Sequence, residues 1–356
     1  MAFDQFSTLK RGKDLTRDQF RDGSVPVAGS NGVIGFHDTA NVRAPGITVG
    51  RSGSVGRVTF FTQDIWAHNT ALFVANLHGN DARFAAYFLN FLELGRFGSG
   101  ASVPTLDRNS FRLMPVIVPP FAEQGKIAGV LGLVQRAMEQ QERLIALTTE
   151  LKKALLHQLF THGLRGEPQK QTEIGPVPQS WRVTRLDEFC ILQRGFDIIK
   201  KDQVAGDVPV VSSGGIASYH NIAKVKGPGV VVGRKGTLGK VHYLDGNYWP
   251  HDTTLWVKDF KGHDPLFTSY FLKTLRLERY NSGASNPTLN RNTVHAELVA
   301  YPAIDEQGAI GRVLRMVDDK AKVHAQRHAA LTDLFRTLLH HLMTAQILVT
   351  DLDIME

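Results

Sequence analysis

Hydrophobic and polar positions follow two different patterns along this chain. In its first part, short runs of β-branched and aromatic residues are separated by Gly, Ser, Asn and Pro, which is typical of strands joined by turns. Four such runs lie at 46–50, 57–61, 71–75 and 114–118. Between them, Phe84, Phe88 and Phe91 recur at helical spacing and predict a helix over 82–94. This mixture predicts an α+β globular domain.

The pattern changes to a heptad repeat over 123–162. This stretch lacks Pro, and its apolar side chains recur largely in steps of four and three. They are Ile127, Leu131, Val134, Met138, Ile145, Leu155 and Leu159. A helix of this length is roughly 58 Å long at about 1.5 Å per residue. One small domain cannot cover such a helix, so the pattern predicts that it packs against another helix.

The whole pattern occurs twice. When the sequence is aligned with itself without gaps, 45–58 and 228–241 share eight of 14 residues, and 99–110 and 282–293 share nine of 12. The apolar heptad positions recur from Ile310 to Leu342. Because the repeating unit is a globular domain followed by a long helix, the sequence predicts a pseudo-twofold body whose two helices pair within one chain.

Polar residues interrupt the seam, which is the row of apolar heptad positions through which the two long helices are predicted to pack. They are Gln141 and Thr148 in the first copy, and His324 and His328 in the second. Polar side chains at such positions either fix the register of a helix pair or are solvated beside it. The sequence leaves both interpretations open.

These patterns divide the chain into six segments. They are a globular domain at 1–122, a long helix at 123–165, a linker at 166–183, a second globular domain at 184–305, a second long helix at 306–347 and a tail at 348–356. The linker is separated from the first helix because its Gly and Pro residues break any helix there.

Composition narrows the class of protein. Of the 356 residues, 42% are hydrophobic and 21% are charged, which is typical of a globular chain, and a net charge of +7 slightly favours an anionic partner. The single cysteine, Cys190, cannot form an internal disulfide, which indicates a reducing compartment such as the cytoplasm. We expect no membrane partner, because no apolar run reaches the roughly 18 residues that a span needs and we find no signal peptide.

Two equivalent glycine-rich loops, 50–56 and 233–239, invite comparison with a phosphate-binding loop. The Walker pattern requires Gly-Lys followed by Ser or Thr, but Val241 follows Lys240, and the first copy has Arg57 in place of the lysine. Both loops are instead typical of tight hairpins in which glycine adopts positive φ. A third interpretation is that their Arg, Ser and Lys side chains enter a DNA groove, where Arg binds guanine and backbone amides bind phosphate.

A second pair of equivalent loops, 99–109 and 282–292, is rich in Ser, Thr, Asn and Arg. Such side chains donate to phosphates, and Asn pairs with adenine, although an ordinary polar loop has the same composition. Both interpretations stay open at this point, and the two loops together make a candidate DNA-binding surface in each domain. Its predicted residues are Arg51, Ser52, Ser54, Arg57, Ser99, Ser102, Thr105, Arg108, Asn109, Arg234, Lys235, Thr237, Lys240, Ser282, Ser285, Thr288, Arg291 and Asn292.

The chain lacks recognisable catalytic signatures, so we predict no catalytic residue. An adenine methyltransferase needs Asn or Asp before Pro-Pro-Tyr or Pro-Pro-Phe, whereas Val118 occupies that position here. Two matches to the Asp/Glu-x-Lys pattern of nucleases, at 150–152 and 259–261, are not repeated in the other copy.

Two histidines raise the question of a metal site. His68 and His251 follow Trp66 and Trp249 at the same spacing. A metal ion needs several ligands clustered together, and Cys190 has no cysteine neighbour in the sequence. We therefore expect packed His–Trp pairs and no bound metal.

Taken together, these features resemble the specificity subunit of a type I restriction–modification system. The resemblance is carried by the end of each domain and the start of each long helix, at Val116–Gln124 with Ile127–Leu131 and at Val299–Gln307 with Ile310–Leu314. The segment Ile174–Trp181 is similar to the family's usual lead into a recognition domain. The first copy has no counterpart of it, because Met1 aligns with Thr184.

The resemblance implies that each globular domain is a target recognition domain that reads one half of a split, asymmetric sequence in double-stranded DNA. It implies that the two long helices pair antiparallel, set the unread spacer and dock two methyltransferase subunits, with two motor-nuclease subunits as further partners. S-adenosylmethionine, ATP and Mg²⁺ would then belong to the partner subunits, and no cofactor to this chain. Two alternatives stay open: a self-contained DNA-modifying enzyme with an unrecognised motif, and a coiled-coil adaptor that reads no sequence.

Overall fold

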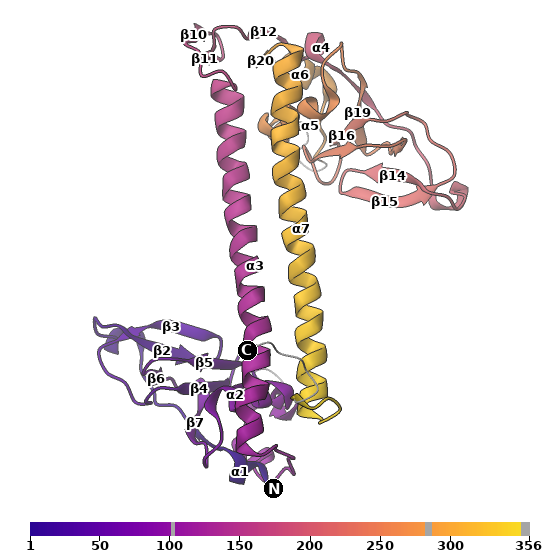
Figure 1. Ribbon diagram of the computed structural model, residues 1–356. Helices are drawn as coiled ribbons and strands as arrows, with labels where there is room; N and C mark the ends of the chain where they lie inside the picture. The colour runs from indigo at the N-terminus through magenta and orange to yellow at the C-terminus, as the bar shows by residue number, and fades with distance from the viewer. Residues whose placement is uncertain (101–103, 282–286, 350–356) are drawn as a thin grey trace. The chain divides into compact units, whose positions relative to one another are not determined.

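A computed structural model describes residues 1–100, 104–281 and 287–349 of the chain (Figure 1). It divides into two compact units. Unit 1 consists of Met1–Glu142 and the C-terminal segment from Gln326, and unit 2 consists of Arg143–Ala325. Each unit therefore contains one globular domain together with a part of each long helix.

The globular domain of unit 1 is built from two sheets. The larger has the strand order β1-β7-β4-β5 and is antiparallel throughout. The smaller has the order β3-β2-β6, with β2 and β6 parallel. The bounds are β1 Thr8–Arg11, β2 Val25–Gly29, β3 Gly32–His37, β4 Gly46–Gly50, β5 Val58–Phe61, β6 Trp66–Ala67 and β7 Ala71–Asn76. Three of the predicted strands are thus confirmed as β4, β5 and β7.

Unit 2 repeats this arrangement strand by strand. Its sheets have the orders β13-β19-β16-β17 and β15-β14-β18. The bounds are β13 Ile191–Arg194, β14 Val208–Ser212, β15 Gly215–His220, β16 Gly229–Gly233, β17 Val241–Leu244, β18 Trp249–Pro250 and β19 Thr254–Asp259. Each strand begins at the residue that the self-alignment pairs with the start of its counterpart, so the predicted duplication of an α+β domain is confirmed.

One helix packs against the larger sheet of each domain. These helices are α2, Ala82–Phe91, and α5, Pro265–Thr274. Each begins at an aspartate whose carboxylate accepts a hydrogen bond of 2.7 Å from the backbone three residues on, which satisfies one of the free amides at a helix start. Both helices end before the predicted limit at Leu94 and its equivalent, because Glu93 and Arg276 adopt left-handed φ values of 47° and 49°.

Aromatic side chains of α2 and α5 form the centre of each core. In unit 1, Phe6 packs edge-to-face against Phe84 and Phe88, with ring centroids 6.3 and 4.8 Å apart. Ile127 and Leu131 of the long helix are fully buried in the same cluster. Burial of each such side chain contributes about 1.5–3 kcal/mol, so the long helix is part of the domain core rather than an appendage.

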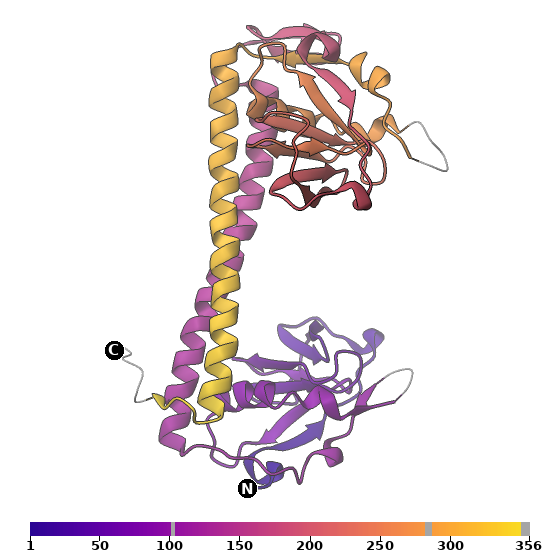
Figure 2. The same cartoon turned by 90° about the vertical axis from the view of Figure 1, so that its right-hand side faces the viewer.

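The two long helices are α3, Phe121–His162, and α7, Ile304–Met343, and both begin two residues before the predicted position. Within unit 1, Glu142 Oε1 of α3 lies 3.1 Å from His328 Nε2 of α7. Within unit 2, Lys152 Nζ lies 2.5 Å from Asp318 Oδ1. In each unit the two helix segments run antiparallel side by side, as both views show (Figures 1 and 2).

The polar residues of the seam differ in their surroundings. Thr148 and His324 are buried within unit 2, and the Thr148 hydroxyl donates to the backbone of Leu144 at 2.6 Å. His328 is partly exposed and pairs with Glu142 in unit 1. Thr148 and His324 are therefore not solvated beside the seam, because both lie inside unit 2.

A buried glutamine near the start of each long helix, Gln124 or Gln307, has a structural role. Gln124 is buried, and its amide accepts from the backbone of Asp81 at 2.9 Å and donates to Asn80 Oδ1 and to the carbonyl of Pro119. The equivalent Gln307 makes the same kind of three-way connection in unit 2. Each glutamine thus fixes the start of a long helix to the loop that precedes α2 or α5.

The segment predicted as a linker is more ordered than we expected. It forms the hairpin β10–β11, with strands Gln169–Thr172 and Gly175–Pro178, followed by β12, Arg182–Arg185, which pairs with β20, Leu298–Tyr301. Gly175 adopts a φ of 100° at the turn. The glycines and prolines here break a helix, as predicted, but they form a hairpin rather than an irregular connection.

The strand predicted at 114–118 is wrong. Its equivalent in unit 2 is the strand β20, but in unit 1 the region keeps only an isolated bridge between Ala2 and Pro115. A strand needs a neighbour for its backbone groups. The counterparts of Thr184 and Arg185 of β12 are Met1 and Ala2. Met1 exchanges two backbone hydrogen bonds with Val116, of 3.0 and 2.9 Å, and Ala2 bridges Pro115, which is too short a pairing to make a strand.

Short elements complete the fold. They are α1 Phe3–Phe6, α4 Leu186–Phe189, α6 Arg291–His295, β8 Gly98–Ser99, β9 Thr105–Leu106, and the 3₁₀ turns η1 Arg17–Gln19, η2 Leu94–Phe97, η3 Arg108–Ser110, η4 Lys200–Asp202 and η5 Leu277–Tyr280. Within the described ranges, every helix is either too short or too polar to cross a bilayer.

Candidate nucleic-acid interface

The first glycine-rich loop of each domain is the tip of a hairpin. Residues 51–57 connect β4 to β5, and Gly50 N donates to the carbonyl of Arg57 at 2.8 Å. Gly53 and Gly56 adopt φ values of 84° and 80°, and a side chain at Gly56 would collide with the backbone of Gly95. A strand rather than a helix follows the loop, so the hairpin interpretation is confirmed and a Walker loop is excluded.

The second predicted loop lies directly against this hairpin tip. In unit 1, Leu106 N donates to the carbonyl of Arg51 at 2.7 Å, and Ser52 forms a β-bridge with Thr105. Unit 2 repeats the contact, since Leu289 N donates to the carbonyl of Arg234 at 2.9 Å. The two loops that we predicted separately therefore form one surface in each domain.

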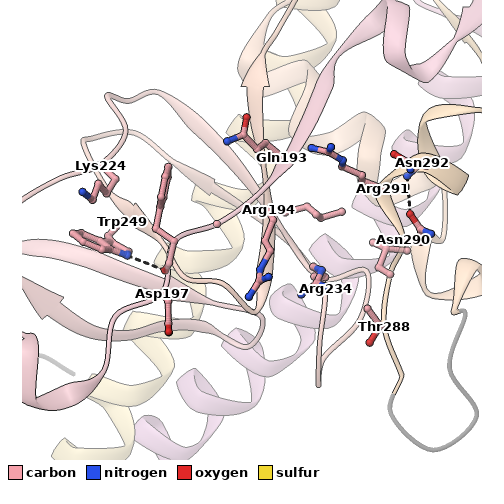
Figure 3. A pocket seen from close by; sticks show the side chains of 14 residues that line it. Gln193, Arg194, Asp197, Lys224, Arg234, Trp249, Thr288, Asn290, Arg291 and Asn292 are labelled. Atoms are coloured by element: carbon pink, nitrogen blue, oxygen red, sulfur yellow. Dashed lines mark hydrogen bonds between the residues drawn. The ribbon is translucent and has the colours of Figure 1, made fainter.

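In unit 2 this surface opens into a pocket of about 980 Å³ (Figure 3). The pocket lies where the hairpin tip, the second loop and the end of β13 meet. It is lined by Gln193, Arg194, Gly195, Phe196, Asp197, Lys224, Arg234, Trp249, Leu255, Thr288, Leu289, Asn290, Arg291 and Asn292. Figure 3 shows Arg194, Arg234 and Arg291 reaching it from three different segments of the chain.

Unit 1 has a pocket of about 510 Å³ at the same place. It is lined by Lys10, Arg11, Arg51, Leu72, Thr105, Leu106, Asp107 and Arg108. The equivalent of every one of these positions in the second copy also lines the pocket of unit 2. The duplicated fold thus builds the same concave site twice.

Positive charge dominates both pockets. Among the ion pairs of the described residues, none involves Arg51, Arg108, Arg234 or Arg291. Arg108 donates from Nη1 to the carbonyl of Leu9 at 3.0 Å, which positions it without neutralising it. Because cations that lack a carboxylate partner repel one another, such a pocket favours an anionic ligand.

The structure groups the predicted residues into three sets. The pocket residues are Arg51, Thr105, Arg108, Arg234, Thr288, Arg291 and Asn292. Those on the hairpin tips or the flanks of the second loop, outside the pockets, are Ser52, Ser54, Arg57, Ser99, Asn109, Lys235, Thr237 and Lys240. Three more, Ser102, Ser282 and Ser285, lie outside the described residues.

Some of the tip side chains are held by the protein itself. Arg57 donates from Nη1 to Asn31 Oδ1, and Lys240 Nζ donates to the carbonyl of Gly214 at 2.9 Å. These bonds connect each hairpin tip to the neighbouring β2–β3 or β14–β15 hairpin. The tip arginine and lysine thus have a structural partner in addition to any ligand.

Sequence reasoning missed the pocket wall formed by the end of the first strand. Lys10 and Arg11 end β1, and Arg194 ends β13. The available signal was the Arg-Gly pair that recurs at 11–12 and 194–195. A side chain at Gly12 would meet the carbonyl oxygen of His68 at 2.1 Å, so only glycine lets the strand end pass this close to the sheet.

The predicted pairing of adjacent His and Trp residues is wrong. Trp66 packs edge-to-face against His37, with ring centroids 5.2 Å apart, and Trp249 packs in the same way against His220 at 5.3 Å. His68 instead makes hydrogen bonds with Thr70 Oγ1 at 2.9 Å and with the carbonyl of Leu15 at 3.1 Å. The last residue of β3 or β15, two strands away in the same sheet, therefore takes the place that we assigned to the histidine nearest in sequence.

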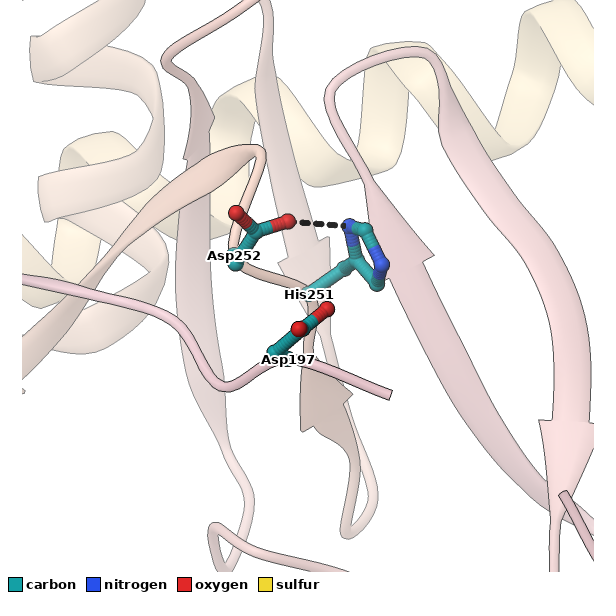
Figure 4. A group of neighbouring side chains, drawn as sticks. All are labelled: Asp197, His251 and Asp252. Atoms are coloured by element: carbon teal, nitrogen blue, oxygen red, sulfur yellow. Dashed lines mark ion pairs between the residues drawn. The ribbon is translucent and has the colours of Figure 1, made fainter. Parts of the chain in front are cut away.

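Unit 2 contains one group of side chains with the chemistry of metal ligands, Asp197, His251 and Asp252 (Figure 4). One ligand atom of each lies within 4.8 Å of the others. His251 Nδ1 lies 3.1 Å from Asp252 Oδ1, and Arg194 lies 2.8 Å from the other oxygen of that carboxylate. Arg194 offsets the charge of the Asp252 carboxylate, whereas Asp197 takes part in none of the ion pairs found among the described residues. The absence of a bound metal stays a prediction.

Comparison with known proteins places this architecture in a family. Residues 3–152 and 178–333 match the type I restriction modification DNA specificity domain. The chain belongs to this family. Each matched stretch contains one globular domain and part of the long helix that follows it. The identification made from the sequence is therefore confirmed, and the family is the specificity component of type I systems rather than a catalytic one.

Individual relatives agree with this assignment. The specificity subunit of the type I restriction enzyme MjaVIII from Methanocaldococcus jannaschii is 30% identical over 97 residues, which are 27% of this chain and only 23% of that protein. The S subunit of a type I system from M. genitalium has a TM-score of 0.74 at 17% identity, covering 95% of this chain and 94% of that one.

A second solved chain, from work on the complex assembly and conformational transition of the type I system, has a TM-score of 0.53 at 13% identity and covers 96% of both chains. At such low identity these two structures show that the fold is shared, and nothing about individual contacts.

Proposed function

We propose that each globular domain of this type I specificity chain binds one half of a split duplex DNA target, through its hairpin tip, its second loop and the pocket between them. The observation that carries the proposal is the recurrence of one arginine-lined pocket at the same place in both copies. Arginine, threonine and asparagine side chains on a concave surface suit both phosphate and base-edge contacts.

The long helices offer a surface for protein partners. In unit 2, an apolar groove of about 440 Å³ lies between α3 and α7 and is flanked by Leu147, Leu151 and Met316, whose side chains are 59%, 51% and 70% exposed. Unit 1 has exposed leucines at the equivalents of Met316 and Leu151, namely Leu133 and Leu334. Apolar helix faces exposed to this extent are typical of docking sites.

We therefore propose that two methyltransferase subunits dock on these faces, one on each unit, and that motor-nuclease subunits join through them. S-adenosylmethionine, ATP and Mg²⁺ would be bound by those partners, and the assembly would work in the cytoplasm. This chain would contribute sequence selection and no chemistry of its own.

A domain exchange tests the reading of half-sites. Residues 1–122 are replaced by the corresponding domain of another specificity subunit, the chain is assembled with its methyltransferase, and methylated adenines are mapped by single-molecule sequencing. We expect one half of the target to change and the other to stay. The matched exchange of 184–305 should change the opposite half. If both halves are unchanged by either exchange, the globular domains do not read the DNA.

Two assays address the alternatives. Turnover by the pure chain with S-adenosylmethionine, or with Mg²⁺ and DNA, would contradict a non-catalytic role. A footprint of the assembled complex that protects no defined sequence would favour a mere adaptor.

The docking surface has its own test. Met316→Asp places a charge in the apolar groove and should reduce co-purification of the methyltransferase subunit, whereas Ile174→Asp, on the β10–β11 hairpin and 42% exposed, should leave it unchanged. Equal recovery of the partner with both variants would contradict docking at this groove.

A further inference from the structure

The two pockets have the same residues at some equivalent positions and different residues at others. Three arginines are identical in both: Arg11 and Arg194 at the strand end, Arg51 and Arg234 at the hairpin tip, and Arg108 and Arg291 near the end of the second loop. The residues beside them differ. Lys10 corresponds to Gln193, and Asp107 corresponds to Asn290.

The backbone fixes the central arginine of each trio. Arg51 N donates to the carbonyl of Thr70 at 2.8 Å, and its own carbonyl accepts from Leu106 at 2.7 Å. Arg234 is held in the same way by Thr253 and Leu289, at 2.9 Å in both cases. These hydrogen bonds fix the backbone from which each arginine side chain extends. Less conformational entropy is therefore lost when the guanidinium binds an anion.

The charge balance of the trio points to an anion. The strand-end arginines have carboxylate partners, since Arg194 pairs with Asp252 and Arg11 lies 3.9 Å from Asp14. The other four, Arg51, Arg108, Arg234 and Arg291, take part in none of the ion pairs found among the described residues. Guanidinium groups that share one pocket repel each other, and a phosphate would offset this repulsion with bidentate hydrogen bonds.

We infer that the arginine trio of each pocket binds a phosphate of the DNA backbone, and that the positions that differ between the copies read the bases. This inference rests on the proposed function. Contacts that are the same in both domains cannot make the two domains prefer different half-sites, whereas phosphate contacts set the register of a protein on DNA without reading its sequence. Base selection then falls to pairs such as Lys10 and Gln193, Ser52 and Lys235, and Asp107 and Asn290.

The test uses the full chain in complex with its methyltransferase, and a pool of randomised duplexes. Bound duplexes are sequenced, and the dissociation constant for the selected duplex is measured at several salt concentrations. Arg51→Ala and Arg234→Ala should select the same consensus as the unaltered chain. Their affinity should fall, and the slope of log affinity against log salt should become shallower by about 1 for each lost phosphate contact.

Three further variants separate base reading, phosphate binding and a general loss of charge. Ser52→Lys combined with Asp107→Asn gives domain 1 two of the three differing residues of domain 2 and should change the preferred bases in one half of the consensus only. Arg51→Lys should retain part of the affinity and of the salt dependence. Arg43→Ala, a side chain that is 92% exposed and paired with Asp64 outside the pocket, controls for loss of one positive charge.

Several outcomes overturn the inference. If Arg51→Ala removes a base from the consensus, the trio reads bases. If it changes neither the affinity nor the salt slope relative to Arg43→Ala, the trio is only structural. A different failure, in which the unaltered complex selects no consensus at all, refutes the proposed function itself.

Discussion

Tyr270 Oη donates a hydrogen bond of 2.7 Å to Asp318 Oδ2 in unit 2, whereas the equivalent Tyr87 donates one of the same length to the neutral Gln135 in unit 1. Lys152 adds a contact of 2.5 Å to the same carboxylate. Burial, and after it the hydrogen bond to Asp318, raises the pKa of the Tyr270 hydroxyl. The same helix contact is therefore charged in one copy and neutral in the other.

This difference predicts unequal responses to mutation. Asp318→Asn keeps an acceptor for Tyr270 but removes the ion pair, and it should cost about 1 kcal/mol, since both charged side chains are about 30% exposed. Asp318→Ala also leaves the Tyr270 hydroxyl without its acceptor and should cost about 2 kcal/mol. Tryptophan fluorescence during urea unfolding reports mainly on unit 2, which contains Trp181, Trp249 and Trp256, whereas the fourth tryptophan, Trp66, lies in unit 1.

High salt supplies the control for this prediction. The destabilisation caused by Asp318→Asn should shrink as salt screens the ion pair, whereas that caused by Gln135→Ala should not change. An identical salt response in the two variants would show that charge contributes nothing to the contact in unit 2.

Unit 2 should also be the more sensitive to acid. Burial lowers the pKa of His242, His263 and His295, so the folded state favours their neutral rings. A group with a lowered histidine pKa stabilises the fold fully above its unfolded pKa of about 6.5, and this contribution is lost as the pH falls below that value. We expect the unfolding midpoint of unit 2 to drop between about pH 7.5 and 5.5.

The equivalent position in unit 1 suggests a variant that tests whether His263 causes this sensitivity to acid. His263 stacks on Phe189 at 4.2 Å and makes a hydrogen bond with Gln307, and the equivalent residue in unit 1 is Asn80, which bonds Gln124 without titrating. His263→Asn should therefore reduce the loss of stability in acid while keeping the bond to the glutamine. If the pH dependence is the same in the variant, the ring of His263 is not responsible for it.

The repeated glutamines should be sensitive to substitution in spite of their neutral side chains. Gln124→Leu leaves the Asp81 amide, the Asn80 amide oxygen and the Pro119 carbonyl without their partner, and an unsatisfied buried group costs about 1–3 kcal/mol. Thermal unfolding should show a lower midpoint for Gln124→Leu, and the matched Gln307→Leu should behave alike in unit 2. A melting temperature unchanged in both would contradict the role that we assign to this pair.

The sequence predicted the features that local chemistry decides. The heptad spacing identified α3 and α7 to within two residues at their starts, because an apolar stripe on a long helix has few alternative explanations. The glycines of the two hairpin tips were recognised because positive φ demands them. The gap-free alignment of the chain with itself then fixed the equivalence of the two domains before any fold was known.

Features decided by distant partners were not predictable. The pairing of β2 with β3 shifts register between Val27 and Ala28, which disturbs the strict alternation of a strand. The pocket needed Arg11, Arg51 and Arg108 to meet from three parts of the chain, and no single window of sequence contains that information. The strand predicted at 114–118 failed for the same reason, since its existence depends on a neighbour rather than on its own residues.

Cys190 provides a prediction about access to the core of unit 2. It is the only cysteine of the chain and is fully buried, and this burial, with a smaller effect of Asp259, raises the pKa of its thiol to about 12. Because the thiolate is the reactive form, alkylation at neutral pH should require opening of the core and should run about 10²-fold or more slower than in denaturant.

The measurement is the rate at which a maleimide labels Cys190 with and without urea. Ser110→Cys in a Cys190→Ser background, an exposed position in unit 1, should label rapidly under both conditions. Rapid labelling of Cys190 without denaturant would mean that the core formed by β13, β19 and α5 opens far more readily than its burial implies.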